Sequence, residues 1–431
     1  MAQAKVYNVL VFPAGTEVAF EIHHALRYSK FVRLFGATSV DCHADMLFKD
    51  CQGGLPYAGD DALIASLNQL TERWDIDYIY PAHDSAALAL VRAQAQLKAT
   101  VVSSPLETME VCRSKNRTYQ HLAGADYLPR CYDQPQDISA FPIFAKPSVG
   151  QGSQGVCLVN DRRELDELLS SGTEYALCEY LPGQEITVDC FTDRHGQLRY
   201  IGPRSRERIR AGIAVRSRLL PPDPWVEHIA RDIAARLDFN GVWFFQLKKD
   251  SSGLYKLLEI GPRIAGTMGL SRARGVNMPL LSLYNLWGYD VDLLIQDAEL
   301  LVDRAFISRF KHDYDYDRVY IDLDDTLILR SQVVPSMMAF LYQCRDQGKK
   351  LILLSKHRGG DVEGYLLQHC ICPQLFHQIV HLGKNDSKSD YIQGRAIFID
   401  DSFAERRQVQ QRLGIPVFDL DMVESLLDWR G

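Results

Sequence analysis

Two aspartates separated by a single residue close an apolar run near the C-terminus. Residues 319–323 are rich in the β-branched and aromatic side chains of a buried strand, and Asp322 and Asp324 stand at its end. A carboxylate placed there can attack a phosphate ester and form an aspartyl-phosphate. A second carboxylate can protonate the leaving group and later activate water. The pattern predicts an enzyme that breaks phosphate bonds.

Three later segments carry the other groups that this chemistry requires. Ser355 follows the next apolar run and offers a hydroxyl to a phosphate oxygen. Asp400 and Asp401 follow a further apolar run and offer carboxylates to Mg²⁺. Lys384 and Lys388 are both candidates for the cation.

A glycine-rich segment in the middle of the chain suits a different use of phosphate. An apolar strand leads to Lys146, and glycines are then interleaved with small polar residues, among them Ser148, Gly152 and Ser153. Backbone N–H groups of such a loop can bind phosphate oxygens while the lysine supplies a positive charge. Glycine spacing alone is equally compatible with a flexible surface turn.

Oxygen-bearing side chains follow in later strand-like segments. Residues 177–185 are an apolar run that leads through a turn to Glu185. Gln246 and Glu259 lie in two further strand-like segments. Oxygen ligands of this kind suit Mg²⁺, which keeps a few protein ligands beside phosphate oxygens. The alternative for Glu259 is a strand-end carboxylate in a surface salt bridge.

A group of arginines lies between these segments: Arg204, Arg206, Arg208, Arg210 and Arg216. The first four alternate with other residues, so on one strand their guanidinium groups would share a face and repel one another unless an anion lies opposite. Arginine binds carboxylate or phosphate through paired hydrogen bonds. We therefore predict an anionic small-molecule substrate, with a salt-bridge network inside the protein as the alternative.

The elements that position these residues alternate between strands and helices. Over residues 1–110 this order predicts an open α/β domain, in which ligands bind beyond the carboxyl ends of the strands. Residues 15–17 and 83–85 are the candidates there, although Gly15 is equally well explained by a tight turn. The expected elements are strands at 6–12, 78–81 and 100–102 and helices at 18–29 and 86–97.

The rest of the chain divides at a polar linker, residues 310–315. Residues 111–310 are richer in extended segments, which indicates an α+β domain, and residues 316–431 again alternate strand and helix as in an α/β domain. Asp322 and Ser355 are 33 residues apart, and so are Ser355 and Lys388. Short helices and strands fill these intervals, which leaves no room for an inserted cap domain.

In this order, the glycine-rich segment and the segments after it resemble the ATP-grasp superfamily, and more closely its carbamoyl-phosphate-synthase-like ligases, over about residues 5–310. The resemblance implies a pre-ATP-grasp domain over residues 1–110, an ATP-grasp fold over residues 111–310, and ATP and Mg²⁺ as cofactors. It implies that Lys115 and Lys146 contact the ATP phosphates and that the loop from Ser148 to Gly155 closes over them. The backbone of Glu179 and Leu181 would bind adenine, and Glu185 would bind the ribose. Gln246 and Glu259 would hold Mg²⁺, Arg263 would face the transferred phosphoryl group, and the acceptor would lie beside the arginines.

Two positions depart from the pattern of that superfamily. A carboxylate is usual at the position of Gln246, and the usual Glu-x-Asn reads Glu259, Ile260, Gly261 here. One anionic ligand and one amide oxygen are therefore missing. We expect either that a second Mg²⁺ is bound less tightly or that another residue compensates.

The four segments of the C-terminal part resemble the haloacid-dehalogenase-like (HAD) phosphatase superfamily over about residues 316–431. The resemblance implies a Rossmann-like domain without a cap. It makes Asp322 the nucleophile, Asp324 the acid and base, Ser355 the phosphate anchor, Lys388 the lysine, and Asp400 the main further metal ligand beside Asp322 and Asp324. A site without a cap is open, so we expect a bulky substrate or a lid borrowed from elsewhere.

Composition excludes several other classes of protein. The net charge of −7 argues against a general nucleic-acid-binding surface, and no run approaches the ~20 apolar residues of a membrane span. The first residues lack the pattern of a signal peptide, and the ten cysteines are scattered without CxxC pairs. These features predict a cytoplasmic protein with reduced thiols that binds neither nucleic acid nor membrane.

The combined pattern predicts a bifunctional enzyme. An ATP-dependent ligase would join a carboxylate to an amine or other nucleophile through an acyl phosphate, and a Mg²⁺-dependent phosphatase would act beside it, on the same metabolite or another. Two alternatives remain for the ATP-grasp part: a small-molecule kinase, or a nucleotide-binding module that regulates the phosphatase. The sequence names none of the substrates and leaves the oligomeric state open, a homo-oligomer included.

Overall fold

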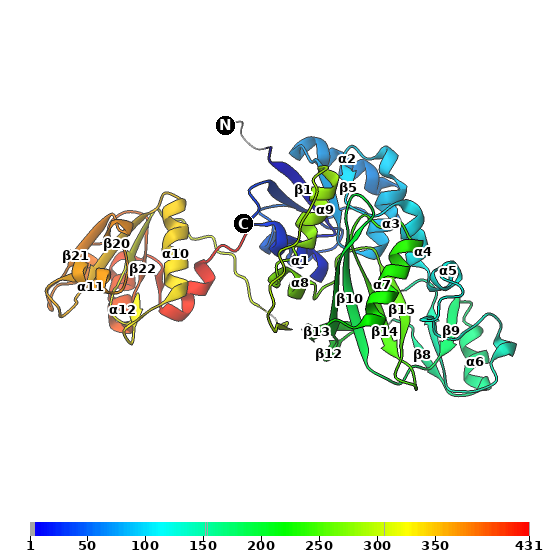
Figure 1. The fold of residues 1–431 in the computed structure, drawn as a ribbon. Helices are drawn as coiled ribbons and strands as arrows, with labels where there is room; N and C mark the ends of the chain where they lie inside the picture. Colours follow the sequence, from blue (N-terminus) through cyan, green and yellow to red (C-terminus); the bar gives the residue numbers. More distant parts are fainter. Residues whose placement is uncertain (1–4, 151, 153, 306, 431) are drawn as a thin grey trace. The chain divides into compact units, whose positions relative to one another are not determined.

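The computed structural model describes residues 5–150, 152, 154–305 and 307–430. They form two compact units, which we call the N-terminal unit (up to Ala305) and the C-terminal unit (Ile307–Arg430) (Figure 1). Each unit has its own hydrophobic core and is considered by itself. Of the described residues, no helix is long and apolar enough to cross a membrane.

The N-terminal unit begins with a five-stranded parallel sheet in the order β3-β2-β1-β4-β5. Both faces of the central strand are buried, because Val9 and Val11 pack in one core and Leu10 and Phe12 in another. Its elements are β1 (Tyr7–Phe12), α1 (Glu17–Leu26), β2 (Val32–Ala37), β3 (Asp50–Gln52), α2 (Ala62–Trp74), β4 (Tyr78–Pro81), α3 (Asp84–Arg92) and β5 (Thr100–Val101). The helix expected at 86–97 therefore starts earlier and ends at Arg92, where a 3₁₀ turn (Gln94–Gln96) follows.

The order of this sheet places two loops side by side. Strand β1 pairs with β2 on one side and β4 on the other, so the loops after β1 and β4 flank the point where the connections reverse direction. The Thr16 hydroxyl donates a hydrogen bond to the Ala82 carbonyl at 2.9 Å and joins the two loops. Asp84, which begins α3, lies in the second of them.

Two antiparallel sheets follow in the N-terminal unit, in the orders β6-β9-β7-β8 and β11-β10-β14-β15. The core between the second sheet and α7 (Pro224–Arg236) contains a stack of aromatic rings, with the Phe239 and Trp243 centroids 4.1 Å apart. The strands are β6 (Cys131–Tyr132), β7 (Ile143–Pro147), β8 (Cys157–Val159), β9 (Tyr175–Glu179), β10 (Glu185–Thr192), β11 (Leu198–Ser205), β14 (Gly241–Lys249) and β15 (Tyr255–Gly261). A smaller sheet contains β12 (Arg208–Arg210), β13 (Ile213–Arg218) and β16 (Leu301–Asp303).

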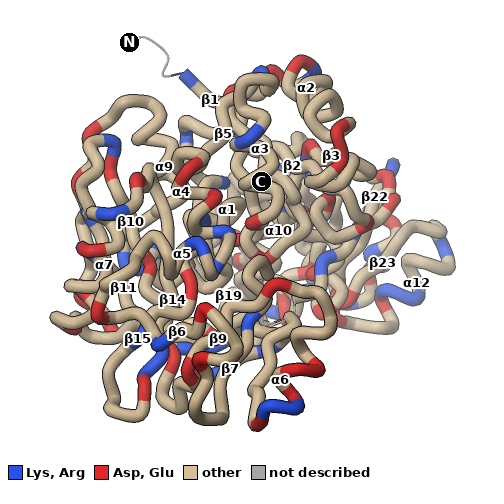
Figure 2. Tube along the Cα trace, turned by 90° about the vertical axis from the view of Figure 1, so that its right-hand side faces the viewer, with Lys and Arg blue, Asp and Glu red and all other residues tan. Residues whose placement is uncertain are grey.

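The helices of this region are mostly short. They are α4 (Leu106–Arg113), α5 (Lys115–His121), α6 (Arg162–Leu169), α7 (Pro224–Arg236), α8 (Gly269–Ala273) and α9 (Met278–Leu286). Helix α6 carries charges of both signs, visible in Figure 2, with i,i+4 pairs at Arg162–Asp166 and Arg163–Glu167. Such pairs are typical of a solvated helix face and indicate no ligand.

The C-terminal unit contains a five-stranded parallel sheet in the order β21-β20-β17-β22-β23. The central strand β17 is buried on both faces, since Val319 and Ile321 pack in one core and Tyr320 in another. Its elements are β17 (Arg318–Ile321), the hairpin β18 (Ile328–Leu329) and β19 (Gln332–Val333), α10 (Pro335–Asp346), β20 (Lys350–Ser355), α11 (Val362–Gln368), β21 (Gln378–His381), β22 (Ala396–Ile399), α12 (Phe403–Leu413) and β23 (Val417–Phe418). The sequence pattern had not revealed the hairpin, β21 or β23, which are only two to four residues long.

Candidate functional sites

A cleft lies between the two antiparallel sheets of the N-terminal unit, with a volume of about 890 Å³ that includes its open mouth. One wall comes from β7 and β9 and the other from β10, β14 and β15. The predicted residues that line it are Lys115, Lys146, Gly152, Glu179, Leu181, Glu185, Arg206, Gln246 and Glu259. Ser153 lies outside the described residues.

Lys146 is buried in this cleft, with 6% of its surface exposed. Its ammonium group donates a hydrogen bond of 3.4 Å to the Tyr119 hydroxyl, which donates in turn to the Leu258 carbonyl. Burial lowers the pKa of Lys146, and Lys115 adds to this effect, while Cys178 and Glu259 oppose it. An anion bound beside Lys146 would therefore stabilise its buried ammonium group, whose positive charge is unfavourable without a partner.

A second group of polar side chains lies where α5 meets the paired strands β14 and β15. Gln246 and Glu259 face each other in the register of these strands. The Lys115 ammonium lies 3.7 Å from a Glu259 carboxylate oxygen. This corner of the cleft thus combines one cation with two oxygen-bearing side chains, a combination that suits a phosphate bound with a divalent cation.

Ser148 was expected to contact phosphate, but the structure places it elsewhere. The residue is buried, and its hydroxyl is 2.9 Å from that of Ser114. Its carbonyl accepts a 2.8 Å hydrogen bond from the Lys115 N–H. These two contacts attach the start of the glycine-rich loop to α5, and Ser148 is not among the residues that line the cleft.

The arginine group does not form one ladder, and this corrects the prediction. Strand β11 ends at Ser205, so Arg204 lies on a different strand from Arg208 and Arg210. Arg204 is buried and donates to both carboxylate oxygens of Asp189 at 2.9 and 3.0 Å. Its charge is satisfied inside the protein, so it is a structural residue.

The other arginines differ in what they contact. Arg206 lies 2.8 Å from the Glu185 carboxylate, donates to the Gly212 carbonyl and lines the cleft. Arg208 and Arg216 both pair with Asp303 on β16. Arg210 is exposed on β12. The salt-bridge alternative therefore applies to Arg204, Arg208 and Arg216, whereas Arg206 belongs to the cleft.

Arg263 lines a second, smaller cavity beside the first. Its guanidinium group makes two 2.7 Å hydrogen bonds to the Asp84 carboxylate, which comes from the loop after β4. Burial alone would raise the pKa of Asp84, but Arg263 outweighs burial and holds it below its usual value. Arg263 was expected to face a phosphoryl group, and the structure shows it fixed at the cavity wall by a paired carboxylate.

Arg113 is a candidate that the sequence did not reveal. It donates to the Gly150 carbonyl in the glycine-rich loop and to the Ser85 hydroxyl in α3, both at 3.1 Å. It also lines the smaller cavity. One arginine in a helix carries no distinctive pattern, so only the fold brings it to this place.

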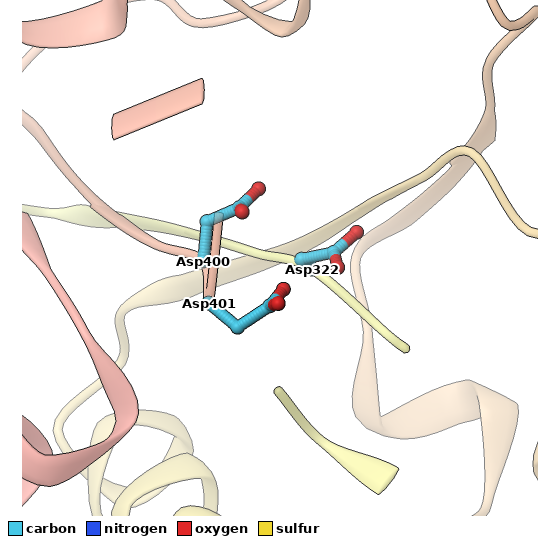
Figure 3. A group of neighbouring side chains, drawn as sticks. All are labelled: Asp322, Asp400 and Asp401. Carbon is cyan, nitrogen blue, oxygen red and sulfur yellow. The ribbon is translucent and has the colours of Figure 1, made fainter. Parts of the chain in front are cut away.

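The C-terminal unit has a cluster of three aspartates at the carboxyl ends of neighbouring strands. Asp322 follows β17, and Asp400 and Asp401 follow β22, with ligand atoms within 4.8 Å of one another (Figure 3). The Lys388 ammonium lies between two of them, 2.6 Å from Asp322 and 2.5 Å from Asp400. Lys388 is buried and Lys384 is exposed, so Lys388 is the lysine of this site.

The charges of this cluster favour a bound cation. Burial raises the pKa of Asp322 to about 7, Lys388 lowers it, and Asp400 raises it further. Burial also raises the pKa of Asp400 despite Lys388. Three carboxylates with one lysine leave an excess of negative charge on oxygen ligands, and this donor set fits Mg²⁺.

The Asp324 carboxylate, predicted as a metal ligand, lies outside the cluster. Both of its oxygens are 3.0 Å from His357 Nδ1, and 45% of its side chain is exposed. The chain turns after β17, with Asp325 in the left-handed region at φ 56°, and the Asp324 carboxylate contacts His357 in the loop after β20. Asp401 takes its place among the clustered carboxylates.

Ser355 and His357 are joined in the loop after β20. Ser355 is fully buried at the end of the strand, and its hydroxyl accepts a 3.0 Å hydrogen bond from the His357 N–H. The His357 ring stacks on Tyr365 with centroids 4.4 Å apart. The sequence analysis missed His357. Its place two residues after the strand-end serine was the only signal that could have suggested it.

Comparisons with known proteins support one part of this description. A family model described as "ATP-grasp in the biosynthetic pathway with Ter operon" matches residues 173–303. The carbamoyl phosphate synthase arginine-specific large chain of Bacillus subtilis (strain 168) is 25% identical over 215 residues, which is 44% of this chain and 21% of that protein. The chain therefore spans about a fifth of the length of this curated relative.

Solved structures extend the likeness to the fold. The biotin carboxylase domain of the Hydrogenobacter thermophilus 2-oxoglutarate carboxylase, solved with MgADP, ADP and bicarbonate, matches with a TM-score of 0.56 at 16% identity, over 68% of this chain and 72% of that one. The L-amino acid ligase of Bacillus licheniformis matches with a TM-score of 0.50 at 20% identity, over 66% and 75%. Identities this low show the fold alone. This chain thus contains a mixed α/β fold of the ATP-grasp type, with an ATP-grasp ligase match over residues 173–303.

Proposed function

We propose that the N-terminal unit is an ATP-dependent ligase that activates a carboxylate as an acyl phosphate and transfers the acyl group to an amine or other nucleophile. The observation that carries this proposal is the convergence of Lys115, Lys146, Gln246 and Glu259 on one cleft of an ATP-grasp fold. Names among the similar proteins, a carbamoyl phosphate synthase and an L-amino acid ligase, support this class of reaction.

The residues of the cleft have distinct roles in this proposal. The backbone of Glu179 and Leu181 would bind the adenine, and Glu185, which Arg206 holds, would bind the ribose; all four residues line the cleft. Lys115 and Lys146 bind the phosphates, and Gln246 and Glu259 would hold Mg²⁺, which neutralises phosphate charge when bound. The protein contributes orientation and charge, and it forms no covalent bond with the substrate.

The test is nucleotide turnover by the purified full chain. With ATP, Mg²⁺ and a panel of carboxylate and amine pairs, we expect release of ADP that requires both substrates. Lys146→Met should abolish that release. ADP release that needs only one substrate and leaves a stable phosphorylated product would point to a kinase, and tight ATP binding without turnover over the whole panel would point to a regulatory module.

We further propose that the C-terminal unit is a Mg²⁺-dependent phosphatase of the HAD type. The carrying observation is the Asp322 carboxylate beside Lys388 and the Asp400–Asp401 pair at the ends of parallel strands. In this reaction Asp322 attacks phosphorus and becomes an aspartyl-phosphate, Asp324 protonates the leaving oxygen, and Asp324 then takes a proton from the attacking water. Ser355 and Lys388 bind the phosphate oxygens.

The aspartyl-phosphate itself provides the test of this second activity. A radiolabelled phosphate ester should leave label on the protein that resists acid and is released by hydroxylamine. Label should be absent from Asp322→Asn. Phosphate release by Asp322→Asn at the wild-type rate would show that another group performs the attack. Whether the two activities share one metabolite is tested by supplying the ligase product to the phosphatase.

A further inference from the structure

The end of β15 is shaped by a contact between Gly261 and Phe244. The two residues face each other in the register of β14 and β15. A Cβ atom built on Gly261 would lie 2.5 Å from both Cε1 and Cζ of the Phe244 ring. Such a distance is far inside van der Waals contact, so no side chain fits at position 261 while the ring stays in place. Position 261 therefore requires glycine, because the Phe244 ring occupies the volume that a side chain would need.

This contact removes a cation ligand from the cleft. Alternate residues of a strand share a face, so a side chain at position 261 would lie beside Glu259. The Phe244 ring fills that place instead, with the Arg263 guanidinium 5.2 Å from the ring centroid. An aromatic ring offers no oxygen to a hard cation such as Mg²⁺. Gln246 and Glu259 remain as the two oxygen donors of this corner.

Other carboxylates near the two cavities are already paired. Asp84 is bound by Arg263 through both oxygens, and Glu185 is bound by Arg206. Glu179 also lines the cleft, and its carboxylate accepts a 2.8 Å hydrogen bond from the Arg130 N–H. Among the described residues, the one cluster of three potential metal-ligating side chains is Asp322, Asp400 and Asp401 in the other unit. The nucleotide corner therefore has a single carboxylate, Glu259, that faces a cation, and even this one lies 3.7 Å from Lys115.

The fixed positive charges argue against a second divalent cation. Lys115 and Lys146 line the cleft, where Glu259 lies 3.7 Å from Lys115 and Glu179 accepts a hydrogen bond from the Arg130 N–H. Adding two divalent cations would place further positive charge among these lysines, where repulsion is strong at short distance. Lys115 supplies part of the charge that a second cation would bring, whereas the charge of Arg263 is already balanced by Asp84.

We propose that the cleft binds its nucleotide with a single divalent cation, held by Glu259 and Gln246, and that Lys115 replaces a second cation in neutralising phosphate charge. This proposal rests on the nucleotide binding proposed above. It assigns a function to the two departures from the superfamily pattern, Gln246 and Gly261. In this proposal the Phe244–Gly261 pair excludes the second cation, because it leaves no oxygen ligand at this position.

The direct test counts Mn²⁺ bound to the full chain with a non-hydrolysable ATP analogue, by equilibrium dialysis and electron paramagnetic resonance. The Asp400→Asn/Asp401→Asn variant removes the aspartate cluster, so that the count reports on the cleft. We expect one Mn²⁺ per bound analogue and no spin coupling between ions. Two Mn²⁺ per analogue would overturn the inference and leave the ligase proposal standing. Absence of analogue binding would overturn both.

Variants at the aromatic contact sharpen the test. In the same background, Phe244→Ala/Gly261→Asn removes the ring and adds an amide oxygen, and Gln246→Glu then restores a carboxylate. We expect the triple variant to bind a second Mn²⁺, while Gln246→Glu alone binds one because the ring still fills its place. A second Mn²⁺ in the Gln246→Glu single variant would show that Phe244 excludes nothing.

The role of Lys115 is measured independently. Lys115→Met should weaken analogue binding about tenfold at saturating Mn²⁺, since one charge-assisted contact is lost and no second ion compensates. Lys98→Met, an exposed lysine that pairs with Glu72, is the matched control. Unchanged affinity in Lys115→Met would contradict the assigned role. Because this readout is binding, it does not depend on the ligase reaction.

Discussion

The cleft of the N-terminal unit and the aspartate cluster of the C-terminal unit differ in the balance of their charges. The cleft is lined by four cationic side chains, Lys115, Lys146, Arg206 and Lys248, and by three carboxylates, Glu179, Glu185 and Glu259. In the cluster, three carboxylates lie together, and Lys388 contacts two of them, Asp322 and Asp400. In the proposed reactions a nucleotide brings its own negative charge to the cleft, whereas the cluster binds a cation before a phosphate approaches. The two sites should therefore differ in their dependence on metal.

The largest expected effect is a loss of phosphatase activity that leaves the activity of the cleft unchanged. Asp322→Asn removes the proposed nucleophile, so phosphatase activity should fall by at least about 10³-fold. ATP turnover by the N-terminal unit should be unchanged in the same variant. Asp325→Asn is the matched control, because its exposed carboxylate contacts neither Lys388 nor the cluster. Equal loss in both variants would mean that the effect is structural.

The next effect concerns the cleft. Lys146→Met should weaken ATP binding roughly ten- to hundredfold, as expected for loss of a hydrogen bond to a charged group. The melting temperature should not fall, because burial already disfavours the ammonium in the free protein. Calorimetric titration and thermal unfolding measure the two quantities. A large drop in melting temperature with unchanged ATP affinity would make Lys146 a structural residue.

The third expected effect is a pH dependence of Mg²⁺ binding at the aspartate cluster. Because burial raises the pKa of Asp322 to about 7, protons compete with Mg²⁺ for this carboxylate below that pH. The affinity of the aspartate cluster for Mg²⁺ should therefore weaken about tenfold between pH 8 and pH 6. Titration of the full chain without nucleotide measures this. An affinity that stays constant over that range would show that Asp322 is already ionised at pH 6.

The smallest effect concerns the residue that positions Asp324. His357→Ala should lower the phosphatase kcat about tenfold and leave KM nearly unchanged, because Asp324 loses its partner but keeps the carboxyl group proposed to transfer the proton. His369→Ala, which removes another ring that contacts Tyr365, is the control. If KM rises with kcat unchanged, His357 contacts the substrate and does not position Asp324.

The sequence predicted most accurately which apolar runs are strands and which side chains follow their carboxyl ends. The apolar runs before Asp322, Ser355 and Asp400 are the strands β17, β20 and β22, and β17 lies within about two residues of the expected 319–323. Parallel strands in one sheet bring their carboxyl ends to the same edge, so the proximity of these side chains followed from local pattern alone. The choice between Lys384 and Lys388 needed the structure.

The arginine group shows why the same reasoning failed elsewhere. Alternation predicts a shared face only while one strand continues, and β11 ends at Ser205. Strand pairing places Thr187 of β10 opposite Arg204, and Asp189, two positions further along β10, binds the Arg204 guanidinium. The contact between the Ser148 and Ser114 hydroxyls was likewise not visible from the sequence, because the two residues lie 34 positions apart.

The sequence by itself determined which strands end in carboxylates, where the glycine-rich loop lies, and which two ligand positions depart from the superfamily. These features depend on hydrophobic periodicity and residue type over short stretches. Only the tertiary structure decided the partners: Asp84 for Arg263, His357 for Asp324, and the Phe244 ring for Gly261. Each pair joins residues from different strands or loops. Their charges and volumes act on one another only after packing has brought them together.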